Sequence, residues 1–269
     1  MAGVRVRRYS GYLDRTGVFV IEQPVCEGSH FSKGLAPVGC DTRYPPRYMD
    51  KTGKVVIAPP FGGWQFFSEG LAPAQGGYIN ERGAVVIKPQ FDSTMPFSDG
   101  LALVSIDGQR WGYIDLTGRL VLSPPFLSWE AGAFGNGLAP VRVAGKVWKN
   151  LWGYMDKSGT LVIAPQFEHA WPFVDGIARV KQDGRFSYIT PAGKPLTPLW
   201  FEMAWDFSEG MGVIQIDGKQ GYLNATGMVV VEPQFKQAES FAGGLARVTI
   251  DGKTGYSTPD GQFVWPPTN

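Results

Sequence analysis

The sequence has 269 residues, of which 43% are hydrophobic, and its 25 basic and 24 acidic side chains nearly balance. This balance gives no electrostatic signal for binding nucleic acid or an anionic membrane, and no segment approaches the ~18 consecutive apolar residues of a membrane span. Glycine and proline number 36 and 21, roughly twice their usual combined share. They leave almost no room for helices, so we predict an all-β protein.

A short phrase recurs along the whole chain. It reads Gly-Tyr-Leu-Asp-Arg-Thr-Gly over residues 11–17 and Gly-Tyr-Ile-Asp-Leu-Thr-Gly over residues 112–118. A period of 30 to 41 residues indicates a tandem array of small supersecondary units. We therefore interpret residues 1–269 as one array of about eight repeats. The repeated tyrosine stands at Tyr12, Tyr48, Tyr78, Tyr113, Tyr154, Tyr188, Tyr222 and Tyr256.

The repeat that contains residues 101–122 illustrates the predicted unit. Residues 101–106 form a first strand, Asp107-Gly108 a tight hairpin turn, and residues 111–114 a second strand. A turn over residues 115–118 leads to a third strand at 120–122. We name these strands A, B and C, and predict a three-stranded antiparallel meander of about 34 residues in each repeat.

The turn between strands B and C begins with Asp or Asn in most repeats and ends with Gly in all of them. A side-chain oxygen at its start can accept a backbone N–H two residues later. The glycine predicts a left-handed backbone conformation, which costs a residue with a Cβ about 1 kcal/mol or more. These glycines are Gly17, Gly53, Gly83, Gly118, Gly159, Gly193, Gly227 and Gly261.

Strands A and C have different patterns. Strand A contains a proline at Pro37, Pro73 and Pro140, so we predict that it is an edge strand. Strand C is an apolar run such as residues 85–87, which is typical of a strand covered on both faces. The connector from strand C to the next strand A carries two phenylalanines six residues apart, as at 167 and 173. We expect them to fill the space between meanders.

Both ends of the chain carry strands B and C, and neither end lends a missing strand to the other. Units of this length are also short for four-stranded propeller blades. We therefore favour an open, twisted, solenoid-like array, with an eight-bladed β-propeller as the alternative.

The polar residues predict no catalytic or metal site. The two histidines, His30 and His169, match no catalytic spacing, and each turn offers one carboxylate where calcium takes six to eight oxygens. We expect no enzyme activity and no cofactor. Cys26 and Cys40 are either free or joined by one disulfide.

The combination of Asp-Gly-x-Trp-Gly-Tyr-Ile-Asp, Thr-Gly, an apolar triplet and Pro-Gln-Phe resembles the WG repeats, which are named for their Trp-Gly pair. Trp111-Gly112 and Trp152-Gly153 keep the pair, whereas the other repeats depart from it, for example at Gln220-Gly221. The resemblance covers essentially the whole chain. It implies an all-β binding scaffold of bacterial type with no shared catalytic residues.

Connector positions that differ between the repeats, while the strand and turn residues stay constant, are the candidates for binding a partner. Four residues after the first connector phenylalanine stand Gln65, Met95, Trp171, Trp205 and Glu239, with Glu130 in a longer repeat. We expect Trp171 and Trp205 to lie on the same side, one repeat apart and partly exposed; the alternative is a packing role. The candidate partner-binding residues are Met95, Trp129, Trp148, His169, Trp171, Met203 and Trp205.

We expect a scaffold that binds a protein, either as a toxin-neutralising immunity protein or in the assembly of a complex. The alternative is a glycan-binding module, for which carboxylate and amide groups beside Trp171 and Trp205 would be the marker. The N-terminus lacks the apolar core of a signal peptide, so we expect a cytoplasmic protein; an exported form whose signal has been removed is the alternative.

Overall fold

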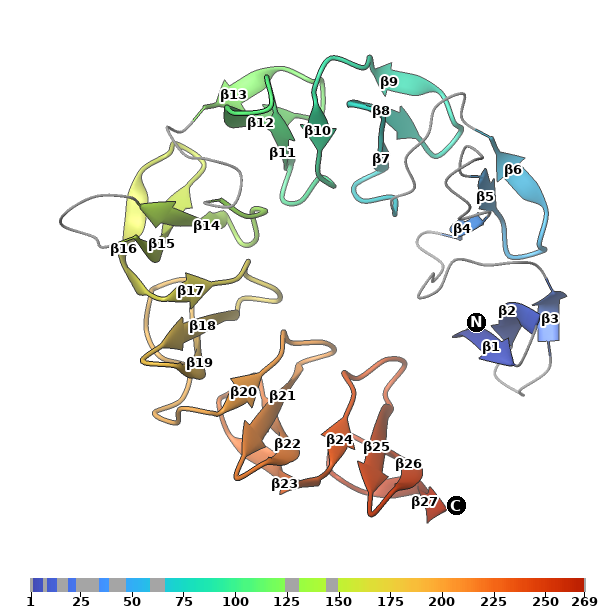
Figure 1. The fold of residues 1–269 in the computed structure, drawn as a ribbon, viewed down its shortest axis with the longest axis vertical. Helices are drawn as coiled ribbons and strands as arrows, with labels where there is room; N and C mark the ends of the chain where they lie inside the picture. Colours follow the sequence, from blue (N-terminus) through green and yellow to red (C-terminus); the bar gives the residue numbers. More distant parts are fainter. Residues whose placement is uncertain are drawn as a thin grey trace. The chain divides into compact units, whose positions relative to one another are not determined.

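A computed structural model describes residues 2–6, 9–13, 19–22, 34–38, 47–58, 66–123, 131–143 and 150–268. Every helix or strand in these residues is a β-strand, and the strands form eight small antiparallel sheets, one for each predicted repeat (Figure 1). None of the sheets in this described part of the chain is closed into a barrel. The predicted all-β class and meander are confirmed, and separate open sheets are consistent with the predicted array.

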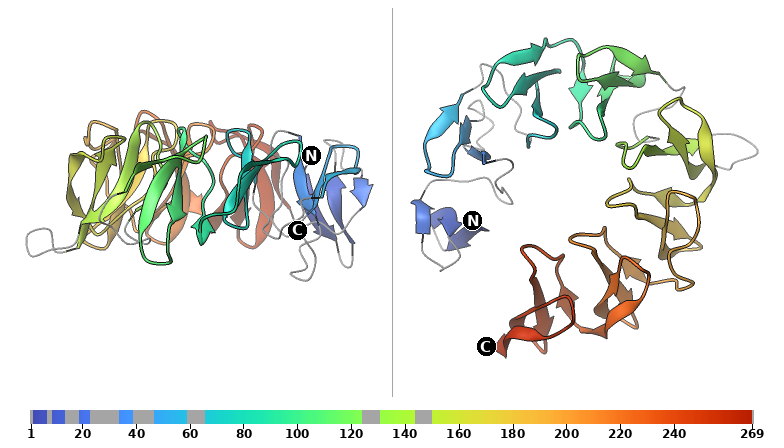
Figure 2. Two further views of the ribbon diagram at one scale, coloured as in Figure 1. Left: turned by 90° about the horizontal axis from the view of Figure 1, so that it is seen from above. Right: turned by 180° about the vertical axis from the view of Figure 1, so that it is seen from behind.

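The chain divides into two compact units, residues 1–128 and 129–269, which each contain four sheets (Figure 2). In the first unit the sheets are β1 (Ala2–Val6), β2 (Tyr9–Leu13) and β3 (Phe19–Glu22); β4 (Ala36–Val38), β5 (Arg47–Met49) and β6 (Val55–Ile57); β7 (Leu71–Ala74), β8 (Gly77–Asn80) and β9 (Val85–Ile87); and β10 (Ser93–Thr94), β11 (Leu101–Ser105), β12 (Trp111–Asp115) and β13 (Leu120–Leu122).

In the second unit the sheets are β14 (Leu138–Val143), β15 (Leu151–Asp156) and β16 (Leu161–Phe167); β17 (His169–Ala170), β18 (Ala178–Gln182) and β19 (Arg185–Ile189); β20 (Met203–Ala204), β21 (Met211–Ile216), β22 (Lys219–Asn224) and β23 (Val229–Phe235); and β24 (Gln237–Ala238), β25 (Ala246–Ile250), β26 (Lys253–Ser257) and β27 (Phe263–Thr268). We number the repeats one to eight in this order.

Strand A is the edge strand in repeats one, two, three and five, the last three of which carry the prolines, but the edge prediction is wrong in repeats four, six, seven and eight. In those four a two-residue strand of the connector pairs with strand A; in repeat four, Met95 N donates to Leu103 O at 3.0 Å. The proline allows the same bond, because it uses only a carbonyl of strand A: in repeat five, Gly132 N donates to Pro140 O at 2.9 Å beside an isolated bridge from Ala131 to Val141. Proline therefore does not mark the edge.

The turn between strands B and C has the predicted geometry. Its closing glycine has φ between 72° and 85° in the seven repeats where the structure describes it, whereas Gly17 lies outside the described residues. In repeat four, Asp115 Oδ1 accepts the N–H of Thr117 at 2.9 Å and that of Arg119 at 3.1 Å. A Cβ on Gly118 would also lie 2.8 Å from Ile87 of the preceding repeat, so close packing is a second reason for glycine.

Within each unit, the hydrophobic core lies between successive sheets. Tyr188 of repeat six packs with Phe201, Phe207 and Ile214 of repeat seven, and all four are buried. The expectation that paired phenylalanines fill these spaces is confirmed, although Phe91 is only partly buried.

The expectation that strand C is covered on both faces is wrong. In β9, Val85 and Val86 are 39% and 46% exposed, and only Ile87 is buried. Strand C lies at the far edge of its sheet from strand A. Its third residue packs in the core, whereas the first two are exposed in β9 and only partly buried in β23.

Candidate partner-binding site

In four repeats the tyrosine holds the backbone of the following connector. Its hydroxyl donates to the carbonyl of the variable connector residue 17 positions later, at 2.6 to 2.9 Å. Burial raises the pKa of Tyr188, so this hydroxyl stays protonated and able to donate. The pairs are Tyr78 with Met95, Tyr154 with Trp171, Tyr188 with Trp205, and Tyr222 with Glu239.

Because the tyrosine hydroxyl binds only the carbonyl of the variable residue, this bond does not constrain which side chain the residue carries. In the second unit the variable residues are Trp171, Trp205 and Glu239, which we name the connector row. The two indoles are half-buried and Glu239 is exposed. The two tryptophans stand at equivalent positions one repeat apart, and each packs against the core that follows its own repeat, which is the packing role considered as the alternative.

Between repeats five and six, an aromatic stack fills the space beside the row. The ring centroid of Trp152 lies 4.8 Å from that of His169, which lies 4.1 Å from that of Trp171. Burial, more than any other influence, lowers the pKa of His169, and nearby Arg179 lowers it further. The imidazole therefore favours its neutral form.

Between repeats six and seven, a guanidinium closes the space beside Trp171. Arg179 Cζ lies 3.9 Å from the centroid of the indole. The same side chain donates to Ala204 O at 2.6 Å and lies 3.1 Å from Asp206 Oδ1. Phe186 covers another side of Trp171, at 5.9 Å between centroids.

Between repeats seven and eight, the equivalent place is an open pocket of about 230 Å³. Val213 and Gln220 stand where the preceding repeat has Arg179 and Phe186. Gln220 Oε1 accepts the N–H of Ala238 at 2.6 Å. The pocket is lined by Trp205, Gln220, Gln237, Ala238, Glu239, Arg247 and Thr249.

Charged groups border this pocket in a fixed arrangement. Arg247 Nη1 donates to Glu239 Oε1 at 2.8 Å, and both side chains are at least half exposed. The pocket therefore offers an indole, two side-chain amides and an ion pair within one small space. Sequence reasoning missed Gln220, although its place as a substitute for the repeat's tryptophan was a visible signal.

The other candidate residues lie apart from the pocket or beyond the described chain. Met95, in the first unit, and Met203 are 42% and 39% exposed. His169 is part of the stack described above. The remaining candidates and the residues considered with them lie outside the described residues: His30, Cys26, Cys40, Gln65, Trp129, Glu130 and Trp148.

Within the described residues, no three His, Cys, Asp or Glu side chains come together in a way that could hold a metal ion. The same part of the chain contains no helix of the length and apolarity needed to cross a membrane.

The model of the WG containing repeat family matches six consecutive stretches, residues 47–75, 77–109, 111–146, 152–186, 186–219 and 221–253. These matches cover more than half of the chain. No curated protein matches it.

Several solved structures are similar in fold. A eukaryotic initiation factor is 12% identical with a TM-score of 0.50, over 83% of this chain and 71% of that one. BamB from Moraxella catarrhalis is 11% identical with a TM-score of 0.47, over 100% and 91%. The C-terminal WD40 domain of Sif2 is 10% identical with a TM-score of 0.48, over 85% and 79%. At these identities the likeness concerns the fold alone.

Proposed function

We propose that this chain, which belongs to the family of WG containing repeat proteins, is a non-enzymatic β-repeat scaffold that binds a protein partner through the connector row. The observation that carries this proposal is at Trp205. Its carbonyl is held by the Tyr188 hydroxyl, whereas its indole borders an open pocket. Tryptophan and arginine at the edge of a pocket are typical of the residues that dominate protein–protein binding.

The pocket suits an anchor residue of a partner. At about 230 Å³ it is smaller than the roughly 300–1,000 Å³ of drug-sized ligand sites, so it would accept one side chain. The preformed ion pair of Glu239 and Arg247 lies at the surface, where such pairs guide specificity more than affinity. The partner would be a toxin, neutralised by an immunity protein, or a subunit of a complex that this scaffold assembles.

Capture of the partner tests this proposal. Tagged protein is mixed with a lysate of the source organism, and the bound protein is identified by mass spectrometry, purified and titrated by calorimetry. We expect Trp205→Ala to weaken binding by ~2 kcal/mol or more, roughly 30-fold. Val162→Ala is the matched control, because Val162 is 49% exposed on β16. Equal affinities of both variants and the original protein would contradict the proposal.

A second candidate function is the binding of a saccharide at the same pocket. The observation that favours it is the presence of Gln220, Gln237 and Glu239 beside Trp205, because an aromatic face and polar hydrogen-bonding groups together suit a sugar ring. A glycan array followed by titration of any hit tests this candidate. Binding of a glycan that Trp205→Ala abolishes would favour it over the protein partner.

A further inference from the structure

The hairpin turn between strands A and B binds a carboxylate in two successive repeats. Gly184 N donates to Glu168 Oε2 at 3.2 Å, and Gly218 N donates to Glu202 Oε2 at 2.9 Å. In each case the glutamate is the first residue after the connector phenylalanine. The Gly218 amide is the largest influence lowering the pKa of Glu202. These turns are therefore anion sites that the chain fills with its own glutamate.

Repeat eight has the same turn between strands A and B, but no glutamate of the described chain is bound to it. Asp251 and Gly252 have φ of 49° and 79°, close to the 49° and 71° of Asp217 and Gly218. Lys236 stands at the glutamate position. Among the described residues, no acceptor lies within hydrogen-bonding distance of the Gly252 amide.

The group that faces the glutamate from the preceding repeat is also basic. Arg185 lowers the pKa of Glu202 by its charge, and Lys219 holds the place of Arg185 one repeat later. Lys219 and Lys236 therefore stand at the positions that Arg185 and Glu202 hold one repeat earlier.

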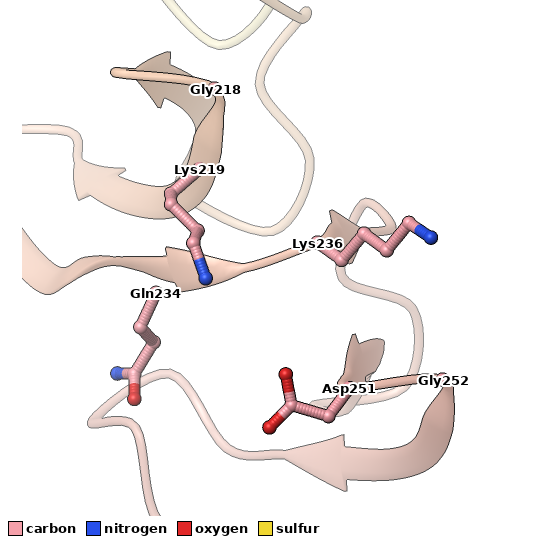
Figure 3. Close-up of a pocket in the computed structure, with 6 residues that line it drawn as sticks. All are labelled: Gly218, Lys219, Gln234, Lys236, Asp251 and Gly252. Carbon is pink, nitrogen blue, oxygen red and sulfur yellow. The ribbon is translucent and has the colours of Figure 1, made fainter.

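A pocket of about 360 Å³ lies at this place (Figure 3). Its wall is made by Gly218, Lys219, Gln234, Lys236, Asp251 and Gly252. The Asp251 carboxylate faces the space in Figure 3. Asp217 occupies the equivalent turn position beside Glu202, so an aspartate there is compatible with a bound carboxylate.

We propose that this pocket binds the carboxylate of an acidic side chain presented by the protein partner. The carboxylate would accept the Gly252 N–H, as Glu202 accepts that of Gly218, and would lie against Lys219 and Lys236. The inference rests on the proposed protein-binding function and specifies the chemistry of one contact. A carboxylate is favoured over other anions because the same backbone turn binds one in the two preceding repeats.

A titration with defined probes tests this assignment. Protein labelled with ¹⁵N is titrated at low ionic strength with a hexaglutamate peptide and, separately, with inorganic phosphate, and the amide resonances of the turns are followed. We expect the Gly252 resonance to shift and saturate with the peptide. Lys236→Glu supplies a carboxylate from the chain itself, so it should weaken the peptide at Gly252 about tenfold or more.

The reciprocal variant and a charge control complete the experiment. Glu202→Lys frees the Gly218 amide and should give this resonance a response to the peptide that it lacks in the original protein. Lys194→Glu changes the net charge as Lys236→Glu does, at an exposed turn, and should leave the response of Gly252 intact.

Three results would overturn the assignment: no saturable shift at Gly252, equal responses in Lys236→Glu and Lys194→Glu, or saturation by phosphate at lower concentration than by the peptide. The titration does not require the partner. A negative titration would refute the acidic contact at Gly252 and leave the proposed binding at Trp205 untouched. A negative capture experiment would refute the proposed protein binding, and the titration would still report whether the turn binds a carboxylate.

Discussion

Trp171 and Trp205 occupy the same place in successive repeats, yet their surroundings differ. Beside Trp171, Arg179 and Phe186 fill the space between repeats six and seven. Beside Trp205, the equivalent space between repeats seven and eight is an open pocket. The tyrosine hydroxyl binds the backbone in both places.

Separate residues therefore determine the backbone frame of the repeat, meaning its strands and turns, and the surface that the repeat presents. The frame requires the buried tyrosine and the turn glycine, which recur. The surface depends on strand positions that differ between repeats, such as Gln220, which lines the pocket, in place of Phe186. A repeat protein can thus gain a pocket by loss of a filling side chain, without any change of backbone.

The largest expected effect on stability is at Phe186, and its equivalent one repeat later, Gln220, provides the comparison. Phe186 is only 8% exposed and packs in the core, so Phe186→Ala should lower the free energy of unfolding by ~3–5 kcal/mol. Gln220→Ala loses the hydrogen bond to Ala238 and a long one, of 3.4 Å, to Gln215, and should cost only ~1 kcal/mol. Urea denaturation of both variants measures the difference. Similar losses would show that the two spaces are not distinct in packing.

A second prediction concerns the glycine of the Trp-Gly pair. A Cβ on Gly221 would lie 2.4 Å from Val231 O and 2.8 Å from Pro233 N, so Gly221→Ala should cost about 1–3 kcal/mol by overpacking. Repeat six has Ser187 at this position, and its hydroxyl donates to Leu199 O at 2.9 Å.

Ser187→Ala is the matched comparison, because it removes only that hydrogen bond and should cost ~1 kcal/mol. Chemical denaturation measures both variants. If Gly221→Ala is as stable as the original protein, strand C does not approach strand B as closely as described.

The smallest expected effect is a pH dependence at His169, which belongs to the stacked space between repeats five and six. Its pKa is lowered in the folded state, so the unfolded chain binds the proton more readily. The stability contributed by the neutral ring is complete above about pH 6.5, the usual histidine value, and is lost as the pH falls through the lowered pKa.

The half-exposed ring limits this loss to well under ~1 kcal/mol. Thermal melts between pH 8 and pH 5, roughly the range in which histidine titrates, should show a shallower decline for His169→Phe than for the original protein. Parallel declines would mean that His169 does not contribute.

Much of the frame could be predicted because local chemistry determines it. The positive φ of Gly118 follows from the turn that Asp115 begins, and the position of Tyr154 within its repeat follows from the regular spacing of the tyrosines, although its hydrogen bond to the connector was not predicted. The partial exposure of Trp171 and Trp205 was also predictable, since their position varies between copies of one frame.

The errors came from interactions between segments distant in sequence. The apolar run at Val85 and Val86 suggested a covered strand, but coverage depends on how far the next sheet extends. The short strand that pairs with Leu103 was missed because two residues carry no periodic signal. The pocket beside Trp205 was missed because it depends on Gln220 being too small and polar to fill the space.

We infer that the pocket beside Trp205 binds the partner, whereas the buried tyrosines and turn glycines stabilise the fold. The variant Gln220→Phe addresses this claim, because Gln220 lines the pocket and phenylalanine stands at the equivalent position, Phe186, in the preceding repeat. We expect the melting temperature to be equal or higher and the affinity for the captured partner to fall about 100-fold or more, as for loss of a binding hot spot. Unchanged affinity in a folded variant with a closed pocket would contradict the account.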